Sequence, residues 1–485
     1  MNKNADKIKI LVVGAGKAGE LLVKNIICDS ESAFNVVGLI DDDKTKQDAL
    51  ILGIKVLGGV NDLRDIVNER GIEEIFIAIP SERGKAIRKI VENTSGLKVN
   101  YKILPRQSEV LMQDFEKDYL RYIRKIKVED LLGGEITKAD QKDVSNFAQG
   151  QTIMITGAAG SIGSELSRQV AAYGAKKIIL YDWWENGIFE LRNQLLENYP
   201  ESRFEFLIGD IKDRKKINSV IKDFKPTTIF HAAAYKHVPL MEQNPAEAIK
   251  NNIVGTRTVA EIAIKHSVKK FILVSSDKAV NPTNIMGATK RSAEKIIHIL
   301  SDSQTKTTFC AVRFGNVINS NGSAIPIFEK QIEMGGPVTV THKEMTRFFM
   351  TIPEAVHLIL QSWVIGENGD LFVLDMGESV RIYDLVRLLI ILQGYEPEKD
   401  IKIKFIGLRP GEKLYEEVLL EEEETKATTL KKIFRTKNQS NFDQLSFLSN
   451  LTHLLELIED DGLNVECLRE QLKTMVSTYH PMLNK

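Results

Sequence analysis

Two segments of the chain share one pattern of apolar, glycine and helical positions. The apolar run Ile8–Val13 leads into Gly14–Gly19, whose glycines have the spacing GxGxxG, and a stretch of helical periodicity follows. The apolar run Thr152–Thr156 leads in the same way into Gly157–Gly163, with the spacing GxxGxxG. A strand, a glycine turn and a helix together open a dinucleotide-binding βαβ unit. The sequence therefore predicts an α/β protein with two Rossmann-like, doubly wound parallel sheets in tandem.

The alternation of strands and helices also suggests where the domains begin and end. Further short apolar runs are typical of buried parallel strands, and they lie at 36–40, 74–79, 177–181, 203–208, 228–231 and 271–275. Beyond about residue 315 the pattern becomes irregular, which favours a smaller α/β lobe. We expect a first domain over 1–130, a linker over 131–149, a second domain over 150–440 and a helical C-terminal segment over 441–485.

Composition and charge argue against several classes of protein. The 485 residues carry 65 Lys and Arg against 66 Asp and Glu, so no overall basic field favours nucleic acid. The three cysteines, Cys28, Cys310 and Cys467, are far apart and form neither a disulfide framework nor a metal motif, and the histidines form no HExxH. The sequence shows no run of ~20 apolar residues and no signal-peptide pattern. We therefore expect no metal, no membrane span and a cytoplasmic location.

The second glycine loop carries the stronger cofactor signal. Asp182 ends the next predicted strand, where a carboxylate can accept both ribose hydroxyls of NAD and would repel the extra phosphate of NADP. Asp210 follows the third strand and could reach the adenine, although an Asp at a strand end is often only a turn former. The glycines could also form no more than a tight turn. The expected residues for a tightly bound, recycled NAD are Gly157, Gly160, Ser161, Ile162, Gly163, Asp182, Asp210, Ile211, Ala232 and Lys290.

Residues that could carry chemistry follow the predicted strand at 271–275. Ser276, Asp277 and Lys278 come directly after it, and Met286 and Lys290 share one face of the next helix because they are four positions apart. Short-chain dehydrogenases place Ser or Thr at this strand end and Tyr-x-x-x-Lys on this helix. Lys290 matches the lysine of that motif. The tyrosine position holds Met286, whose thioether cannot exchange a proton, so the usual base is missing.

Longer motifs extend over nearly all of residues 150–420: TGAAGSIGSEL (156–166), YDWWEN (181–186), HAAAYKHVPLMEQNP (231–245), SSDKAVNPTNIMGATK (275–290), RFGNV (313–317), EMTRFFMT (344–351) and GLRPGEKLYEE (407–417). With these motifs the chain resembles the UDP-N-acetylglucosamine 4,6-dehydratases of bacterial polysaccharide and glycan biosynthesis, an extended short-chain dehydrogenase group. By this resemblance, residues 150–440 form an NAD-binding catalytic core with a C-terminal substrate lobe. Larger members of the group carry a domain like residues 1–130 and usually begin with membrane helices. We expect a soluble form that lacks those helices.

The resemblance implies a reaction and roles for the residues after the strand. The sugar is oxidised at C4, water is eliminated across C5 and C6, and hydride returns to C6, which gives UDP-2-acetamido-2,6-dideoxy-4-hexulose. By matching position, Lys278 is the base at C5, Asp277 the acid for the departing hydroxyl and Ser276 a donor to O4. Lys290 holds the nicotinamide ribose, and Met286 completes the catalytic set by position, with water or a neighbour managing the O4 proton. We expect burial to keep Asp277 protonated and Lys278 neutral.

The same motifs provide candidates for binding the nucleotide sugar. Asn316, Arg347 and Arg409 match by position, and the forked guanidinium of arginine suits a diphosphate. Each of them alone is more often a surface ion-pair partner. His237 could line the sugar pocket or serve only the structure. The first glycine loop, with Asp41 after its second strand, could bind a nucleotide or could be a scaffold that has kept the turn geometry.

Two alternatives to the dehydratase remain. A nucleotide-sugar 4-epimerase shares the cofactor and the oxidation at C4, but it needs the tyrosine and has no use for an acid and a base at C5 and C6. A catalytically silent NAD-binding regulatory protein would fit Met286 and the additional first domain. The intact set Ser276–Lys278 with Lys290 argues for the dehydratase. We expect a UDP-sugar as the partner molecule, no nucleic acid, and a homo-oligomer.

Overall fold

The computed structural model describes residues 7–80, 84–105, 119–132, 141–304, 306–420, 423–436, 442–459 and 464–482. The chain divides into two compact units, each of which we describe by itself. The first consists of Met1–Thr137, Gly322–Lys343 and Arg381–Ile406, and the second of Lys138–Asn321, Glu344–Val380 and Gly407–Lys485. The boundary between Met1–Thr137 and Lys138–Asn321 falls within the linker expected over 131–149. Residues 133–140 of that linker lie outside the described residues. The two later segments of the first unit come from within the expected second domain, and the domain bounds themselves stay predictions.

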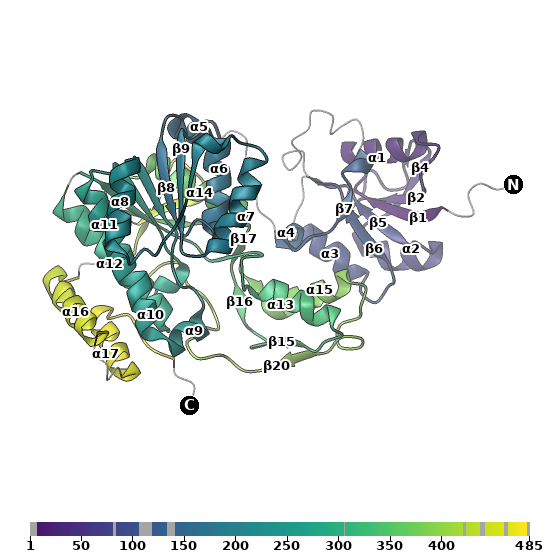
Figure 1. The fold of residues 1–485 in the computed structure, drawn as a ribbon. Coiled ribbons are helices and arrows are strands. Elements are labelled where there is room, and N and C mark those ends of the chain that lie inside the picture. Colours follow the sequence, from purple (N-terminus) through teal and green to yellow (C-terminus); the bar gives the residue numbers. More distant parts are fainter. Residues whose placement is uncertain are drawn as a thin grey trace. The chain divides into compact units, whose positions relative to one another are not determined.

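The first unit is built around a parallel sheet (Figure 1). Its strand order is β3-β4-β2-β1-β5-β6-β7, in which β7 and β3 are antiparallel to their neighbours. Side chains from β1, β2 and α1, among them Ile10, Val12 and Leu22, enclose a core of their own. The elements are β1 (Ile8–Val13), α1 (Lys17–Cys28), β2 (Phe34–Ile40), β3 (Leu50–Ile51), β4 (Ile54–Gly58), α2 (Leu63–Arg70), β5 (Glu74–Ile77), α3 (Lys85–Asn93), β6 (Asn100–Ile103), β7 (Arg124–Lys125), α4 (Val128–Leu132), α13 (Ala324–Glu333), β15 (Val338–Val340), α15 (Ile382–Leu392) and β20 (Ile403–Phe405).

The second unit contains the larger sheet, in the order β10-β9-β8-β11-β12-β13-β18-β22-β21. The strands from β10 to β18 are parallel, and β22 and β21 are antiparallel. The elements as far as Ser303 are α5 (Gln141–Ala148), β8 (Thr152–Thr156), α6 (Ser161–Ala172), β9 (Lys177–Asp182), α7 (Glu185–Leu196), β10 (Phe204–Ile208), α8 (Arg214–Phe224), β11 (Thr228–His231), α9 (Val238–Gln243), α10 (Pro245–Ile249), α11 (Thr256–Lys265), β12 (Lys270–Val274) and α12 (Ile285–Ser303). Those after it are β13 (Thr308–Arg313), β14 (Asn316–Val317), β16 (Thr346–Arg347), β17 (Phe349–Met350), α14 (Ile352–Ile365), β18 (Asp370–Leu374), β19 (Val380–Arg381), β21 (Thr425–Ala427), β22 (Ile433–Thr436), α16 (Gln444–Leu457) and α17 (Val465–Met475).

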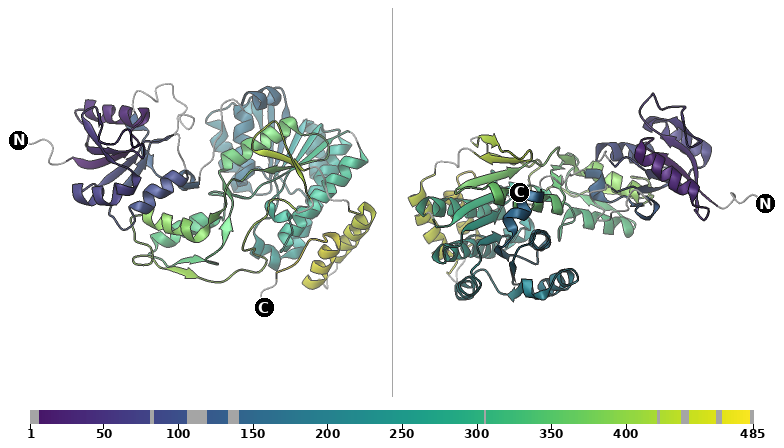
Figure 2. Two further views of the ribbon diagram at one scale, coloured as in Figure 1. Left: turned by 180° about the vertical axis from the view of Figure 1, so that it is seen from behind. Right: turned by 90° about the horizontal axis from the view of Figure 1, so that it is seen from above.

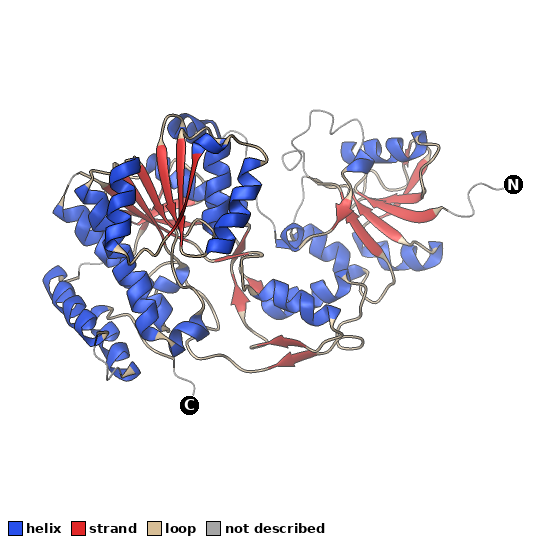
Figure 3. Ribbon diagram, viewed as in Figure 1, coloured by secondary structure: helices blue, strands red, loops and turns tan. Residues whose placement is uncertain are grey.

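Helices cover both faces of this sheet (Figure 3). Along β8, Ile153 and Ile155 pack toward α6 and α14, whereas Met154 between them packs toward α8 and α11. This alternation is the period of two that a strand imposes. The strand order reverses between β8 and β11, and in doubly wound sheets ligands bind outside the carboxyl ends of the strands at that point. The predicted α/β class with Rossmann-like sheets is confirmed.

The C-terminal segment forms two helices that pack together and against helix α12 (Figures 1 and 2). Phe447, Leu451 and Leu472 share one core with Ile296 and Ile299 of α12. A long apolar face of α12 is thereby buried within the second unit. Among the helices that the structure describes, none has the length and apolar character needed to cross a bilayer.

Candidate active site

The second glycine loop is tightly packed at the carboxyl ends of β8 and β11. Gly157 has a φ of +70°, in the left-handed region, and a Cβ on it would lie 2.6 Å from the Ala233 nitrogen. A Cβ on Gly163 would lie 2.0 Å from the Gly157 carbonyl oxygen, so the first turn of α6 sits directly against the loop. Gly160 precedes that helix and has more space, since its added Cβ would meet only the Gly157 oxygen at 3.3 Å. The loop brings the backbone at Ser161 and Ile162 to the switch point of the sheet.

Asp182 braces this loop from the end of β9. Its Oδ2 accepts the Ala159 N–H at 2.9 Å and its Oδ1 accepts the Trp184 N–H at 3.0 Å. Burial raises the pKa of Asp182. The hydrogen bonds from these backbone donors lower it, but their effect is smaller. The carboxylate keeps lone pairs for further donors, since each oxygen accepts one hydrogen bond from these residues.

The other expected cofactor residues have more local roles. Asp210 caps a turn, because its Oδ1 accepts the Lys212 N–H at 2.8 Å and its Oδ2 lies 3.1 Å from the Lys212 ammonium. The Ile211 side chain is buried in the core beneath α8 and α11. Ala232 follows β11, and its N–H donates to the Thr156 carbonyl at 3.0 Å. Asp210 therefore has the geometry of a turn former, which was one of the two roles that the sequence left open for it.

The residues after β12 form a buried polar cluster. Ser276 Oγ donates to Asp277 Oδ1 at 2.7 Å and accepts the Lys278 N–H at 3.2 Å. Asp277 itself opens a short 3₁₀ turn, Asp277–Ala279, and is only 2% exposed. The Lys278 ammonium lies 3.1 Å from Asp277 Oδ1 and 3.0 Å from Asn316 Oδ1. Four of the predicted site residues are thus brought into direct contact.

A further carboxylate in this cluster was missed at the level of the sequence. Glu416 Oε1 lies 2.8 Å from the Lys278 ammonium and 3.2 Å from Arg347 Nε, and its Oε2 accepts Asn316 Nδ2 at 2.8 Å. Its side chain is 4% exposed. The signal lay in the motif GLRPGEKLYEE, in which we singled out only Arg409. The residues after the motif include four consecutive glutamates, 421–424, a composition typical of a solvated surface, and so the sequence around Glu416 gives no local sign that its side chain is buried.

Burial and charge set the protonation of this cluster. Burial raises the pKa of Asp277 to about 6, although Lys278 acts in the opposite direction. Burial acts to raise the pKa of Glu416 as well, but Lys278 and Arg347 lower it to about 2. Burial acts to lower the pKa of Lys278, yet the charges of Asp277 and Glu416 outweigh it and raise that pKa. The expectation for Asp277 has the right direction, whereas the expectation that burial makes Lys278 neutral is wrong for this state.

Met286 and Lys290 lie on α12 as the four-residue spacing predicts. The Lys290 ammonium donates to the Val274 carbonyl at 2.8 Å, and burial lowers the pKa of Lys290 to about 8. The Met286 side chain is 2% exposed and packs in the apolar cluster with Met241 and Ile285. Met286 therefore has the packing role that a flexible apolar side chain fills well.

A cavity of about 190 Å³ opens beside the polar cluster. Asp277, Lys278, Asn316, Arg347 and Arg409 all line it, together with Val238, Pro239, Asn284, residues 410–413, Glu416 and Glu417. His237 directly precedes Val238 at the start of α9, and burial and Lys236 lower its pKa. The cavity gathers the acid and base candidates with most of the predicted substrate residues.

Arg347 is held by the wall of this cavity. Its guanidinium donates to the carbonyl oxygens of Thr346, Lys413 and Leu414 at 2.7–3.2 Å, besides its pairing with Glu416. These bonds make Arg347 a brace for the segment around 413–416. Arg409 lies on the same wall, where its backbone N–H donates to Glu412 Oε2 at 3.1 Å and its carbonyl accepts the Glu412 N–H at 3.0 Å.

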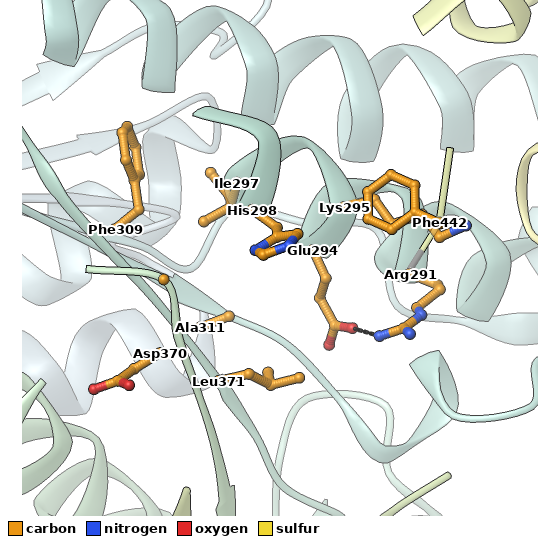
Figure 4. Close-up of a pocket in the computed structure, with 11 residues that line it drawn as sticks. Arg291, Glu294, Lys295, Ile297, His298, Phe309, Ala311, Asp370, Leu371 and Phe442 are labelled. Atoms are coloured by element: carbon orange, nitrogen blue, oxygen red, sulfur yellow. Dashed lines mark hydrogen bonds and ion pairs between the residues drawn. The ribbon is translucent and has the colours of Figure 1, made fainter. Parts of the chain in front are cut away.

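A second, small cavity of about 20 Å³ lies between α12 and the strands β13 and β18 (Figure 4). It borders a buried network in which Arg313 pairs with Glu294 at 2.7 Å and with Glu423 at 2.6 Å. Ser275 at the end of β12 donates to Glu294 Oε1 at 2.6 Å. This volume has room for about one water. The network fixes the strand end that carries the polar cluster.

No group of three or more His, Cys, Asp or Glu side chains is placed to hold a metal ion within the described ranges.

Several known proteins are similar to this chain in sequence or in structure. The sequence profile described as "Polysaccharide biosynthesis protein" matches residues 153–438, and that described as "CoA-binding domain" matches residues 2–105. The capsular polysaccharide biosynthesis protein CapD of Staphylococcus aureus is 47% identical over 89% of this chain and 72% of its own length. A UDP-glucose 4-epimerase of Rickettsia bellii is 38% identical over 59% of this chain and 82% of its own length. The X-ray structure of Pen from Bacillus thuringiensis is 35% identical with a TM-score of 0.56, over 60% of this chain and 91% of Pen.

The second unit, with its parallel sheet, its glycine loop and Asp182, is a Rossmann-like nucleotide-binding fold. The chain belongs to the polysaccharide biosynthesis protein family, because the family profile spans more than half of it and CapD is similar over most of its length. The family that the sequence motifs predicted is thereby confirmed.

Proposed function

We propose that this protein is an NAD-dependent nucleotide-sugar 4,6-dehydratase that acts on UDP-N-acetylglucosamine for polysaccharide or glycan biosynthesis. The observation that carries the proposal is the buried contact of Ser276, Asp277 and Lys278 beside a cavity, with Lys290 beneath the same strand end. An acid and a base in contact suit the removal of water across two neighbouring carbons. Membership in the polysaccharide biosynthesis family supports the pathway class.

The glycine loop has the shape that NAD requires. Gly160 leaves room in front of the N–H groups of Ser161 and Ile162, where a pyrophosphate would be held at the start of α6. Asp182 would accept the adenosine ribose hydroxyls, and Lys290 would donate to the nicotinamide ribose. NAD, when bound, supplies the reversible oxidation of the sugar at C4. Asp210 and Ile211 would border the adenine from a turn and from the core.

The residues of the cluster would then carry the proton transfers. As the C4 alcohol is oxidised, water or a neighbouring group would take the O4 proton, and this proton would later restore the one that Asp277 gives up. Ser276 Oγ would donate a hydrogen bond to O4, where the ketone develops, and the ketone makes the C5 proton acidic. Lys278, once neutral, would remove that proton, and protonated Asp277 would give its proton to the C6 hydroxyl as it leaves as water. Lys278 would return its proton to C5 at the end of the reaction. Met286 would pack against the site without exchanging a proton.

The cavity supports a diphosphate-bearing sugar as the substrate. Arg409 would face the diphosphate, and Asn316 would hold the sugar beside Lys278. Arg347 would contribute by holding the segment around 413–416 in place. His237 would border the sugar from the start of α9. The proposal includes a cytoplasmic location and a homo-oligomer, which cell fractionation and sedimentation would test.

One experiment separates the candidate functions. The similarity to a Rickettsia bellii UDP-glucose 4-epimerase keeps an epimerase as the second candidate. Purified protein is incubated with UDP-N-acetylglucosamine, and the mass of the product is followed. Loss of one water supports the dehydratase, an isomer of unchanged mass supports the epimerase, and no turnover would leave a silent NAD-binding protein. NMR at C5 then reports whether the configuration is retained or inverted.

A further inference from the structure

Glu416 lies at the centre of the polar cluster although it comes from the distant segment 407–417. It contacts three side chains from three different places in the chain: Lys278 after β12, Asn316 in β14 and Arg347 in β16. Each of these side chains donates to the carboxylate at 2.8–3.2 Å. A carboxylate that is 4% exposed and held by two cations and an amide is fixed in position.

Besides the Asn316 amide, the groups that act on the Lys278 ammonium are charged. Asp277 adjoins it in the 3₁₀ turn, and Glu416 faces it from the far wall of the cavity. Two cations oppose these carboxylates: Arg347 in β16 and Lys236 after β11. The negative charges win, because both carboxylates lie within 3.1 Å of the ammonium. In this state Lys278 is a cation, whereas the proposed reaction needs it to accept a proton.

We propose that Glu416 is a positioning residue for this reaction, which orients the Lys278 ammonium and fixes the pH at which that side chain can release its proton. The inference rests on the proposed function for its catalytic meaning, but its physical content, the negative charge that Glu416 holds against Lys278, does not depend on the substrate. Asp277 cannot fill the same role, since it must carry the proton for the C6 hydroxyl. Glu416 is the remaining carboxylate in contact with Lys278 among the described residues.

The direct test is a titration of Lys278 in the NAD-loaded full chain without substrate. Lysines are reductively methylated with ¹³C-formaldehyde, and the Lys278 resonance is assigned by its loss in Lys278→Arg. Removing the charge in Glu416→Gln is expected to lower the apparent pKa of Lys278 by about one unit or more. Glu417→Gln is the matched control, because it removes the same charge at the next position. The Glu417 side chain is 51% exposed and pairs with Lys413, so this variant is expected to leave the Lys278 titration unchanged.

Activity provides the second reading. The productive state holds a proton on Asp277 and none on Lys278, so the alkaline limb of the pH–rate profile follows the titration of Lys278. Glu416→Gln is expected to move this limb toward neutral pH by the shift seen in the NMR titration. A merely structural role would lower the rate without moving the limb.

The outcomes separate this inference from the proposed function. An unchanged Lys278 titration in Glu416→Gln, with an unchanged thermal midpoint, would overturn the inference whatever the substrate is. A wild-type protein that removes no water from UDP-N-acetylglucosamine would overturn the proposed function, while the titration would still decide the role of Glu416. Should Glu416→Gln fold poorly, Glu416→Asp retracts the carboxylate from Lys278 and is expected to shift the titration in the same direction by less. No shift in a folded Glu416→Asp would then contradict the inference.

Discussion

Lys278 and Asp277 hold opposite charges when the cluster is at rest, and the proposed reaction requires both to be neutral. The productive arrangement is a minor form of the same pair, with the proton moved from the ammonium to the carboxylate. The contact of 3.1 Å between the two groups allows that exchange directly. A pair of this kind titrates as a unit, and its two apparent pKa values bound the pH range of activity.

The acid limb of the pH–rate profile is expected near pH 6. Below the Asp277 pKa of about 6 both groups are protonated, so Lys278 cannot accept the C5 proton. Activity therefore rises as the pH increases through about 6, because the pair then loses one proton. Measuring kcat/KM for UDP-N-acetylglucosamine between pH 4 and 9 checks this. The limb should be absent from the residual activity of Asp277→Asn, and a limb that persists there belongs to another group.

Substitution of the proposed base and substitution of the packed methionine should have very different effects on turnover. Lys278→Ala is expected to lose about 10²–10⁴-fold in kcat, which is the usual contribution of a general base. Met286→Leu keeps the volume of a buried side chain that exchanges no proton, so it should retain turnover within a few-fold. Product mass and NADH absorbance follow both variants. Comparable losses in the two would remove the distinction between chemistry and packing.

The loop at 407–413 is positioned by the C-terminal end of the chain. His480 and Met482 donate backbone N–H groups to the carbonyls of Pro282 and Thr283, and the Gly411 N–H donates to the Met482 carbonyl at 2.9 Å. The Asn284 amide also donates to the Gly411 carbonyl at 3.0 Å. The last residues thus connect the segment before α12 with the wall that carries Arg409.

Ending the chain after Tyr479 should loosen this wall. The truncation removes all three backbone hydrogen bonds, so Arg409 would lose its fixed place and KM for the UDP-sugar should rise about tenfold, while kcat changes less. Steady-state kinetics measure the split between KM and kcat. A chain ended after Met482 keeps the three bonds and serves as the control. Equal KM values for the two truncations would show that residues 480–482 do not position the wall.

At the level of elements, the sequence could predict the features that depend on neighbouring residues, and it could not predict those that depend on contacts between distant residues. The two glycine turns, β12 and the spacing of Met286 and Lys290 are local patterns, and the structure has them where the sequence places them. The burial of Glu416 depends on residues about 70–140 positions away, which no local pattern contains. The grouping of 322–343 and 381–406 with the first unit is equally non-local, since α15 packs on α3.

At the scale of the whole molecule, the two glycine loops are packed in the same way, but substitutions in them are expected to have different consequences. A Cβ on Gly19 would lie 1.8 Å from the Gly14 oxygen, as one on Gly163 would lie 2.0 Å from the Gly157 oxygen. In both loops the carboxylate after the second strand accepts an N–H of the loop: Asp41 from Ala15 at 2.8 Å, and Asp182 from Ala159 at 2.9 Å. Only the second loop belongs to the unit that contains the Asp277–Lys278 cluster.

Matched alanine substitutions would therefore separate the two units. Gly163→Ala must displace backbone in the cofactor loop, so NAD affinity and dehydration should both fall by more than tenfold. Gly19→Ala strains the first unit equally and should lower its thermal transition, while NAD affinity stays within about twofold because each unit encloses its own core. Equilibrium dialysis measures NAD binding, and calorimetry measures the transitions. A tenfold loss of NAD affinity in Gly19→Ala, without unfolding of the second unit, would mean that the first unit controls the cofactor site.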